Sequence, residues 1–294
     1  QNEDLRVDFD SRLKLKFVGS QVTSDAGLLA YRELDEALGL TEMGADVLTD
    51  SRQGRNKQHQ LVPLLRQSIY SRLAGYEDVN DAERLCVDPT MRHVVGGRAS
   101  QPEKQAASTS EVGRFETGTL STKSNLTALM NLSGRWIDNV HRRRPLKELI
   151  LDLDSSVSET YGRQQGTAYN GHFECLCYHP LFLFNRHGDL ESAMLRRGNK
   201  ASAKYWRNVL LPVIERYRHL SIPKFFRGDA AFAIPALYRV LEKEGYRYAV
   251  RLKSNAVLER GIEHLLTRPV GRPSHKPKVF FHSFQYQAKS WQRA

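Results

Sequence analysis

The sequence has few of the residues that mark an exported or membrane-bound protein. Its 294 residues include only three cysteines, Cys86, Cys175 and Cys177, and their spacing follows no disulfide pattern. This argues against a disulfide framework and suits a reducing cytoplasm. No apolar run approaches the ~20 residues that a membrane-spanning helix needs, and the polar, acidic stretch from Gln1 to Asp10 is unlike a signal peptide. We therefore expect a cytoplasmic protein with no membrane partner.

Acidic residues are also scarce relative to basic ones. The chain has 33 Asp and Glu against 44 Lys and Arg, which gives a net charge of +11. A cationic surface favours a polyanionic partner, because each Lys or Arg that meets a phosphate releases a condensed counterion. The alternative is a basic protein that binds no nucleic acid. The length and a hydrophobic share of 40% allow two domains with real cores.

Residues 1–145 are predicted to be a mainly helical region. Apolar residues recur at helical spacing, and Gly39 and Gly75 follow two of the segments. The helices are expected at 25–38, 59–73, 79–85 and 125–141. Asp88-Pro89 is typical of a turn, and the Gly, Ser and Thr content of 96–122 predicts a surface loop. The region closes with Arg142-Arg143-Arg144, which is either a solvated boundary or a contact for a DNA backbone.

Residues 146–266 are predicted to form a mixed sheet with helices. The order is β-β-β-α-β-α-β, which predicts an α/β ribonuclease-H-like core. The right-handed crossover rule puts its first and fourth strands side by side. Residues 267–294 differ, with alternation over 279–287 that predicts a further strand. The core strands are expected at 149–153, 178–185, 192–195, 224–227 and 246–252, and the helices at 202–217, 235–245 and 262–266.

Carboxylates follow two of these apolar strands. Asp154 ends the first and Asp229 follows the fourth. Chemistry on a phosphodiester with two Mg²⁺ ions needs hard oxygen ligands that hold the ions ~3.5–4 Å apart. An Asp at a strand end is more often a turn or cap residue, but two on neighbouring strands favour a metal site. Asp152 shares a strand face with Asp154. Asp154 is preferred because it lies nearer the strand's end.

Two other motifs have simpler explanations. His172, Cys175, Cys177 and His179 resemble a zinc knuckle, but their spacing is too tight for a standard site, and buried strand residues are the preferred interpretation. The Gly162–Gly166 stretch lacks the Gly-Lys-Ser/Thr ending of a phosphate loop, so a hairpin loop is expected. Basic side chains that would hold a phosphate near the carboxylates are Arg227, Arg251 and Lys253.

Several short stretches carry a family resemblance in their order and spacing. They are Ala74–Asp81, Asp88-Pro89, Leu151–Ser156, Tyr169–His172, Leu195–Asn199, Phe226–Phe232 and Tyr286–Trp291. With these residues the chain resembles the DDE-class transposases of bacterial insertion sequences, and looks closest to the thirteen-eighty group. The likeness covers nearly the whole chain.

The resemblance implies a ribonuclease-H-like catalytic domain that uses Mg²⁺, with Mn²⁺ as a substitute, to cleave and join DNA. It makes Asp154 the first catalytic and metal-binding residue, with Asp152 as the fallback, and Asp229 the second. The implied partners are the terminal inverted repeats, target DNA and further copies of the chain on DNA, in the nucleoid of a bacterial cytoplasm. The DNA-binding residues are expected to be Arg142, Arg143, Arg144, Arg196, Arg197, Arg227 and Lys253.

The family's catalytic Glu lies beyond a β-rich insertion, whose start is expected at 267–294. The chain begins at Gln1 rather than Met and ends at Ala294, so we expect a truncated transposase in which that Glu is missing. Glu259 and Glu263 are the alternatives for a third ligand within the chain. The alternative function is a catalytically inactive remnant that only binds DNA or a full-length partner.

Overall fold

The computed structural model divides the chain into two compact units, Gln1–Arg144 and Pro145–Ala294. It describes residues 5–7, 10–15, 23–52, 57–97, 104–162, 164–267, 270–272, 275–289 and 291–292. None of the helices within these ranges is both long enough and apolar enough to cross a bilayer.

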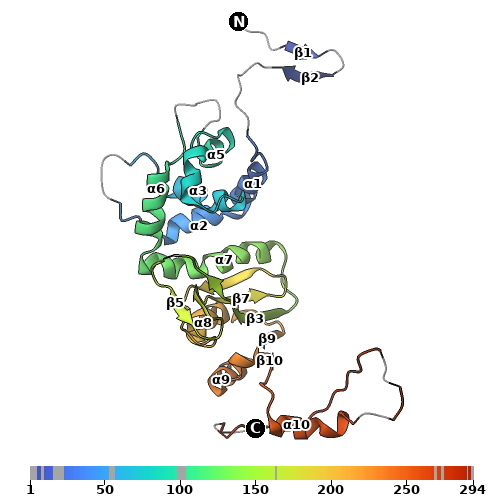
Figure 1. Ribbon diagram of the computed structural model, residues 1–294. Helices are drawn as coiled ribbons and strands as arrows, with labels where there is room; N and C mark the ends of the chain where they lie inside the picture. The colour runs from blue at the N-terminus through green and yellow to red at the C-terminus, as the bar shows by residue number, and fades with distance from the viewer. Residues whose placement is uncertain are drawn as a thin grey trace. The chain divides into compact units, whose positions relative to one another are not determined.

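The first unit is mainly helical, as predicted, after a short antiparallel hairpin of β1 (Leu5–Val7) and β2 (Asp10–Leu15). Its helical segments can be followed along the blue and green part of the chain in Figure 1. They are α1 (Leu28–Leu38), α2 (Leu40–Val47), α3 (Leu61–Leu73), η1 (Val79–Asp81), α4 (Ala82–Leu85), α5 (Pro89–Val94), α6 (Thr109–Arg114), η2 (Phe115–Leu120) and α7 (Lys123–Arg143).

The ends of these helices follow from local chemistry. Gly39 ends α1 in the left-handed conformation, with φ of 73°, which costs glycine little because it has no Cβ. The prediction of a turn at Asp88-Pro89 was wrong, because this dipeptide begins α5. The Asp88 side chain accepts a hydrogen bond of 2.8 Å from the Met91 N–H, and Pro89 occupies the first turn, where its missing N–H costs nothing.

The prediction of a surface loop over 96–122 was also wrong for residues 109–120. Residues 98–103 lie outside the described part, but α6 and the π-helical η2 follow. Val112 and Phe115 are buried in a cluster with Leu64 and Leu65 of α3. Burial of these side chains outweighs the weak helix propensity of the Gly, Ser and Thr around them.

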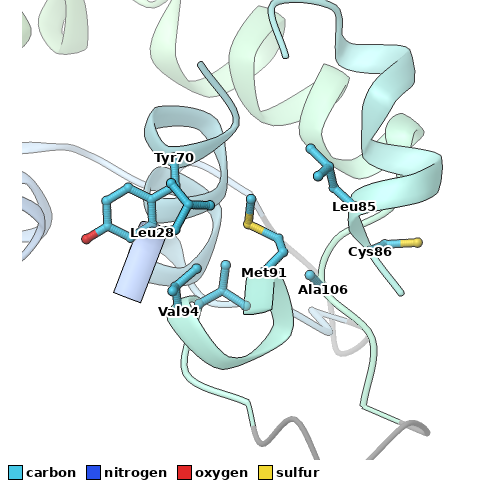
Figure 2. Close-up of a cluster of buried hydrophobic side chains, with 8 residues drawn as sticks. Leu28, Tyr70, Leu85, Cys86, Met91, Val94 and Ala106 are labelled. Carbon is cyan, nitrogen blue, oxygen red and sulfur yellow. The ribbon is translucent and has the colours of Figure 1, made fainter. Parts of the chain in front are cut away.

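A second buried cluster joins α1, α3, α4 and α5. Figure 2 shows the side chains of Leu28, Tyr70, Met91 and Val94 converging from these elements. Met91 and Val94 have no exposed surface. Each fully buried aliphatic side chain of this kind contributes about 1.5–3 kcal/mol, so the tertiary packing rather than the short helices themselves stabilises the unit.

The second unit contains a five-stranded mixed sheet in the order β10-β9-β3-β7-β8 and a separate three-stranded sheet in the order β4-β6-β5. Its helices are α8 (Trp206–Tyr217), η3 (Ala230–Phe232), α9 (Pro235–Lys243), α10 (Ala256–Ile262) and η4 (Glu263–Leu265). Its strands are β3 (Leu149–Ser155), β4 (Ser158–Glu159), β5 (Ala168–Asn170), β6 (Cys175–Tyr178), β7 (Leu181–Asn185), β8 (Leu190–Met194), β9 (Lys224–Gly228) and β10 (Arg247–Val250).

The mixed sheet follows the predicted order of strands and helices. β3, β7 and β8 form an antiparallel meander, and β9 pairs parallel to both β3 and β10. Leu149, Leu151 and Leu153 point to one buried face of β3. Helix α8 packs on the sheet at β7 and β8 and buries its own apolar stripe. The crossover prediction is confirmed, because β3 and β9 are neighbours.

Two strand predictions need correction. The strand expected over 178–185 is two strands, because Pro180 between them has no N–H to donate and the His179 N–H donates instead to the Arg196 carbonyl at 2.9 Å. The strand expected over 279–287 is wrong, since the structure has no strand there. Alternation alone does not make a strand when no neighbour supplies the ladder of hydrogen bonds.

Candidate active site

Asp154 and Asp229 lie at the carboxyl ends of two adjacent parallel strands. Leu153 of β3 is the register partner of Gly228 of β9, and the two Asp residues come next in each strand direction. Adjacent strands are about 4.8 Å apart, so the two residues leave the sheet edge side by side. Both are exposed. This edge is where ligands of open α/β sheets gather.

The two carboxylates also share one face of the sheet. Asp152 and Arg227 are register partners, and Asp154 and Asp229 each follow one of them by two residues. Asp229 keeps an extended backbone, with φ of −77° and ψ of −176°. Because strand side chains alternate with a period of two, both carboxylates point to the face opposite the buried leucines of β3.

Backbone hydrogen bonds orient both carboxylates. Asp154 Oδ1 accepts from the N–H of Ser155 at 2.8 Å, and Asp229 Oδ1 accepts from the N–H of Ala231 at 3.0 Å as the cap of η3. An ionised carboxylate has about four acceptor positions. Each side chain therefore keeps lone pairs that a cation can use while its orientation is held by the backbone.

Asp152 is engaged in a different way. Its two oxygens accept from Nε and Nη2 of Arg227, each at 2.5 Å. The ion pair neutralises Asp152 and occupies both of its oxygens. It also raises the pKa of Arg227, mainly through the hydrogen bond. Asp152, the fallback metal ligand, and Arg227, a predicted phosphate contact, therefore bind each other. They precede Asp154 and Asp229 by two residues along the chain.

The chemistry of the donors fits a hard divalent cation. Mg²⁺ prefers carboxylate oxygens and commonly uses one or two of them together with water and substrate phosphates. Asp154 and Asp229 supply two such groups on rigid strands. Within the described ranges no group of three or more Asp, Glu, His or Cys side chains is placed to share one metal ion. Glu259, one alternative third ligand, accepts instead from the Ser254 hydroxyl at 2.7 Å.

A pocket of 530 Å³ opens beside Asp229. Ser155 and Asp229 form its edge at the sheet. The opposite wall comes from the turn between β5 and β6 and from the loop after β8. The lining residues are Ser155, Tyr169, Asn170, Gly171, His172, Phe173, His179, Asn199, Lys200, Ala201, Ser202 and Asp229.

A buried arginine supports one wall of this pocket from behind, through the backbone of the lining residues His179 and Ser202. Arg196 is 4% exposed, and its guanidinium donates to the carbonyls of His179, Ser202 and Lys204 at 2.7–2.8 Å. Burial lowers the pKa of Arg196 to about 10, so it keeps its charge at neutral pH. The structure therefore places Arg196 inside the loop as a brace, away from the exposed position that a direct DNA contact requires.

The other predicted DNA-binding cations are exposed. In the first unit Arg142, Arg143 and Arg144 lie at the end of α7, where Arg143 also donates to the Ala37 carbonyl at 2.7 Å. In the second unit Arg197 and Lys253 are exposed on loops. Arg227 is exposed too, but it is paired with Asp152.

The four residues of the zinc alternative differ in burial and in hydrogen-bond partners. Cys175 and Cys177 are on β6, and Cys177 is fully buried, where burial raises the pKa of its thiol. His179 Nδ1 lies 2.8 Å from the carbonyl oxygen of Lys200. His172 is exposed in the turn before β6. The preferred interpretation as buried strand residues holds for Cys177. His179 is buried but lies between β6 and β7 rather than in a strand. Sequence reasoning missed that His172 and His179 line the pocket beside Asp229.

The fold and its paired aspartates define a mixed α/β protein with an acidic edge suited to metal-dependent chemistry. The chain matches the family described as transposase DDE domain group 1 over residues 5–294. It therefore belongs to this family of DDE transposase domains. No curated protein matches the chain.

Among solved structures, the chain is similar to the piggyBac transposase synaptic complex with hairpin DNA, at 14% identity and a TM-score of 0.33, over 83% of this chain and 54% of that one. It is also similar to the Mos1 transposase paired-end complex with the left transposon end, at 11% identity and a TM-score of 0.25, over 85% of this chain and 76% of that one. The chain spans about half the length of the piggyBac protein. Similarities this low carry no argument about the site.

Proposed function

We propose that the chain is the transposase of a bacterial insertion sequence of the thirteen-eighty group, which cleaves element ends and transfers them to target DNA. The observation that carries this is the pair Asp154 and Asp229 at the ends of adjacent parallel strands. The strand order β10-β9-β3-β7-β8, with α8 between β8 and β9, supports a ribonuclease-H-like core.

In this proposal Asp154 and Asp229 hold Mg²⁺, or Mn²⁺ in its place. A metal held there would supply Lewis acidity to a water or 3′-hydroxyl oxygen and to the leaving oxygen of the phosphodiester. The chain's own contribution is to position the two carboxylates. Asp154 lies on β3, which buried leucines anchor, and Asp229 follows β9, which the buried Phe226 anchors. Backbone N–H groups orient both side chains. Arg227 stays charged in its pair with Asp152, which uses Nε and Nη2, and in the proposal its Nη1 group donates to a DNA phosphate.

We place the third carboxylate on a Glu outside residues 1–294. Glu259 and Glu263 lie on α10 and η4, and neither forms a metal-sharing group with other acids in the described part. Mg²⁺ usually completes its shell with substrate phosphates in addition to carboxylates and water. Two aspartates without DNA should therefore bind it only weakly.

DNA is the partner that the charge favours. The net charge of +11 supplies a sequence-independent attraction to phosphates. In the proposal, the first unit with Arg142, Arg143 and Arg144 contributes to binding the terminal inverted repeats. Arg197 and Lys253 contact DNA near the carboxylates. Copies of the chain act together on paired ends, in the nucleoid of a bacterial cytoplasm.

The second candidate is a DNA-binding protein without catalysis, which acts on a full-length partner. It is favoured by one observation, that no third metal-sharing side chain lies near the two aspartates in the described ranges. The two functions are distinguished by a single test, DNA cleavage by an extended protein, which is this chain followed by whatever coding sequence lies downstream of residue 294 in its gene.

The test is cleavage and strand transfer on a labelled transposon-end duplex with Mg²⁺ or Mn²⁺. The proposal predicts that Asp154→Asn and Asp229→Asn each abolish both products in the extended protein. Asp46→Asn, an exposed carboxylate on α2, is the matched control and should leave them intact. Cleavage that survives either site substitution would overturn the assignment. Binding without any cleavage by the extended wild type would favour the second candidate.

A further inference from the structure

The pocket beside Asp229 has the lining of a nucleotide site. Its 530 Å³ falls in the range of ~300–1,000 Å³ typical of small-ligand sites. Lys200 is its cation, and Asn199 and Ser202 add an amide and a hydroxyl. Such groups suit a phosphate and the polar edge of a base.

Two aromatic side chains stand open at this pocket. Tyr169 is 58% exposed and Phe173 is 39% exposed. In nucleic-acid proteins, exposed aromatic rings stack on unpaired bases of any sequence. The Phe173 ring is held edge to face by two histidine rings, that of His172 at a centroid distance of 4.9 Å and that of His179 at 5.6 Å.

The pocket walls are fixed before any ligand arrives. Asn170 Oδ1 accepts from the N–H groups of His172 and Phe173 at 2.9 and 3.3 Å, and its amide donates to the Gly198 carbonyl at 2.7 Å. Glu174 holds a left-handed backbone with φ of 56°, a strained state for a non-glycine residue. Together with the Arg196 brace, these bonds tie the turn before β6 to the loop of Lys200. A preformed site loses little entropy on binding.

We propose that this pocket binds one unpaired nucleotide of the DNA strand next to the scissile phosphate. Its base stacks at Tyr169 and Phe173, and its phosphate meets Lys200. The inference rests on the proposed function, since it takes Asp229 to mark the reacting phosphate. The base of a nucleotide within a duplex is stacked on both sides and paired with its complement, so the pocket selects a nucleotide that is unpaired.

The test is a titration of the chain with thymidine 3′,5′-bisphosphate, without metal, by calorimetry. Lys200→Gln should weaken binding by about tenfold, the usual value of a charge-assisted hydrogen bond. Tyr169→Leu should weaken it by about fivefold or more through lost stacking. Asp229→Asn should strengthen binding, because it removes a negative charge that repels phosphate. Lys147→Gln, an exposed lysine of the same unit outside the pocket, is the matched control.

Urea unfolding of each variant separates lost binding from lost folding, and Tyr169 is exposed enough for its substitution to keep the fold. Wild-type affinity in both Lys200→Gln and Tyr169→Leu would overturn the inference. So would an equal loss in Lys147→Gln, or no binding by the wild type at millimolar nucleotide. None of these outcomes involves metal or cleavage, so they are independent of a failure of the proposed function.

Discussion

Asp152 of β3 and Arg227 of β9 are register partners whose side chains meet at two points, with both N–O distances at 2.5 Å. This ion pair lies on the same face of the sheet as Asp154 and Asp229, two residues before each of them. It separates three nearby aspartates into one that is neutralised and two that remain available. This is the structural reason to prefer Asp154 over Asp152 as a metal ligand.

The first prediction compares these two residues. Asp152→Asn should reduce cleavage by the extended protein by about 10–100-fold, as loss of a supporting partner does, while Asp154→Asn should abolish it. Because the Arg227 side chain is 58% exposed, the loss in unfolding free energy for Asp152→Asn should stay within about 1 kcal/mol. The reverse ranking of the two variants in a cleavage assay would make Asp152 the ligand.

The second prediction concerns two adjacent arginines. Arg196→Gln removes donors from buried carbonyls and should cost about 2–4 kcal/mol in urea unfolding. Arg197→Gln, at an exposed position, should change stability by no more than about 0.5 kcal/mol but lower DNA affinity at low salt. Equal stability of the two variants would contradict the role of Arg196 as a brace.

The third prediction concerns Gly198. A Cβ at this position would lie 2.3 Å from the Ala168 carbonyl oxygen and 2.5 Å from that of Cys177. Both atoms belong to strands, so Gly198→Ala should displace the loop and destabilise the unit by about 1–3 kcal/mol. Gly171→Ala, where a Cβ meets nothing within 4 Å, is the control and should unfold at nearly the wild-type urea concentration. A Gly198→Ala protein as stable as this control would show that the loop can move.

The paired aspartates were predictable from the sequence because the signals are local. Alternating leucines in β3 indicate a strand with one buried face, and Asp154 follows at its end. The crossover rule then brings Asp229 beside it, since few connections between parallel strands are allowed. The helices ending at Gly39 and Gly75 were predictable for the same reason.

Other features depend on partners far away in the sequence. The role of Arg196 is set by carbonyls of residues 179–204 that gather only after the loop has folded. The pairing of Arg227 with Asp152 spans 75 positions. The alternation over 279–287 indicated a strand, but a strand also needs a neighbour, and the sequence pattern does not provide one.

The fourth prediction is a pH dependence in the first unit. Asp50 accepts from Nε and Nη2 of Arg52, each at 2.8 Å. These hydrogen bonds, above all other causes, lower the pKa of Asp50 to about 2. A carboxyl whose pKa is lowered on folding stabilises the protein above its unfolded pKa of about 4, and this contribution is lost as the pH falls toward 2.

Asp50→Asn should therefore lower the free energy of unfolding by about 0.5–1 kcal/mol at pH 7. The difference from the wild type should shrink between pH 4 and pH 3 in urea unfolding. A difference that stays constant over this range would mean that the charge of Asp50 contributes nothing.

The central claim is that Asp154 and Asp229 form one metal site. Mn²⁺ binding to the chain, followed by electron paramagnetic resonance, tests it most directly. The account predicts weak binding by the wild type, a loss of about tenfold or more in affinity in Asp154→Asn and in Asp229→Asn, and no further loss in the double variant. Asp46→Asn should bind as the wild type does. Wild-type affinity in either single site variant would contradict the account.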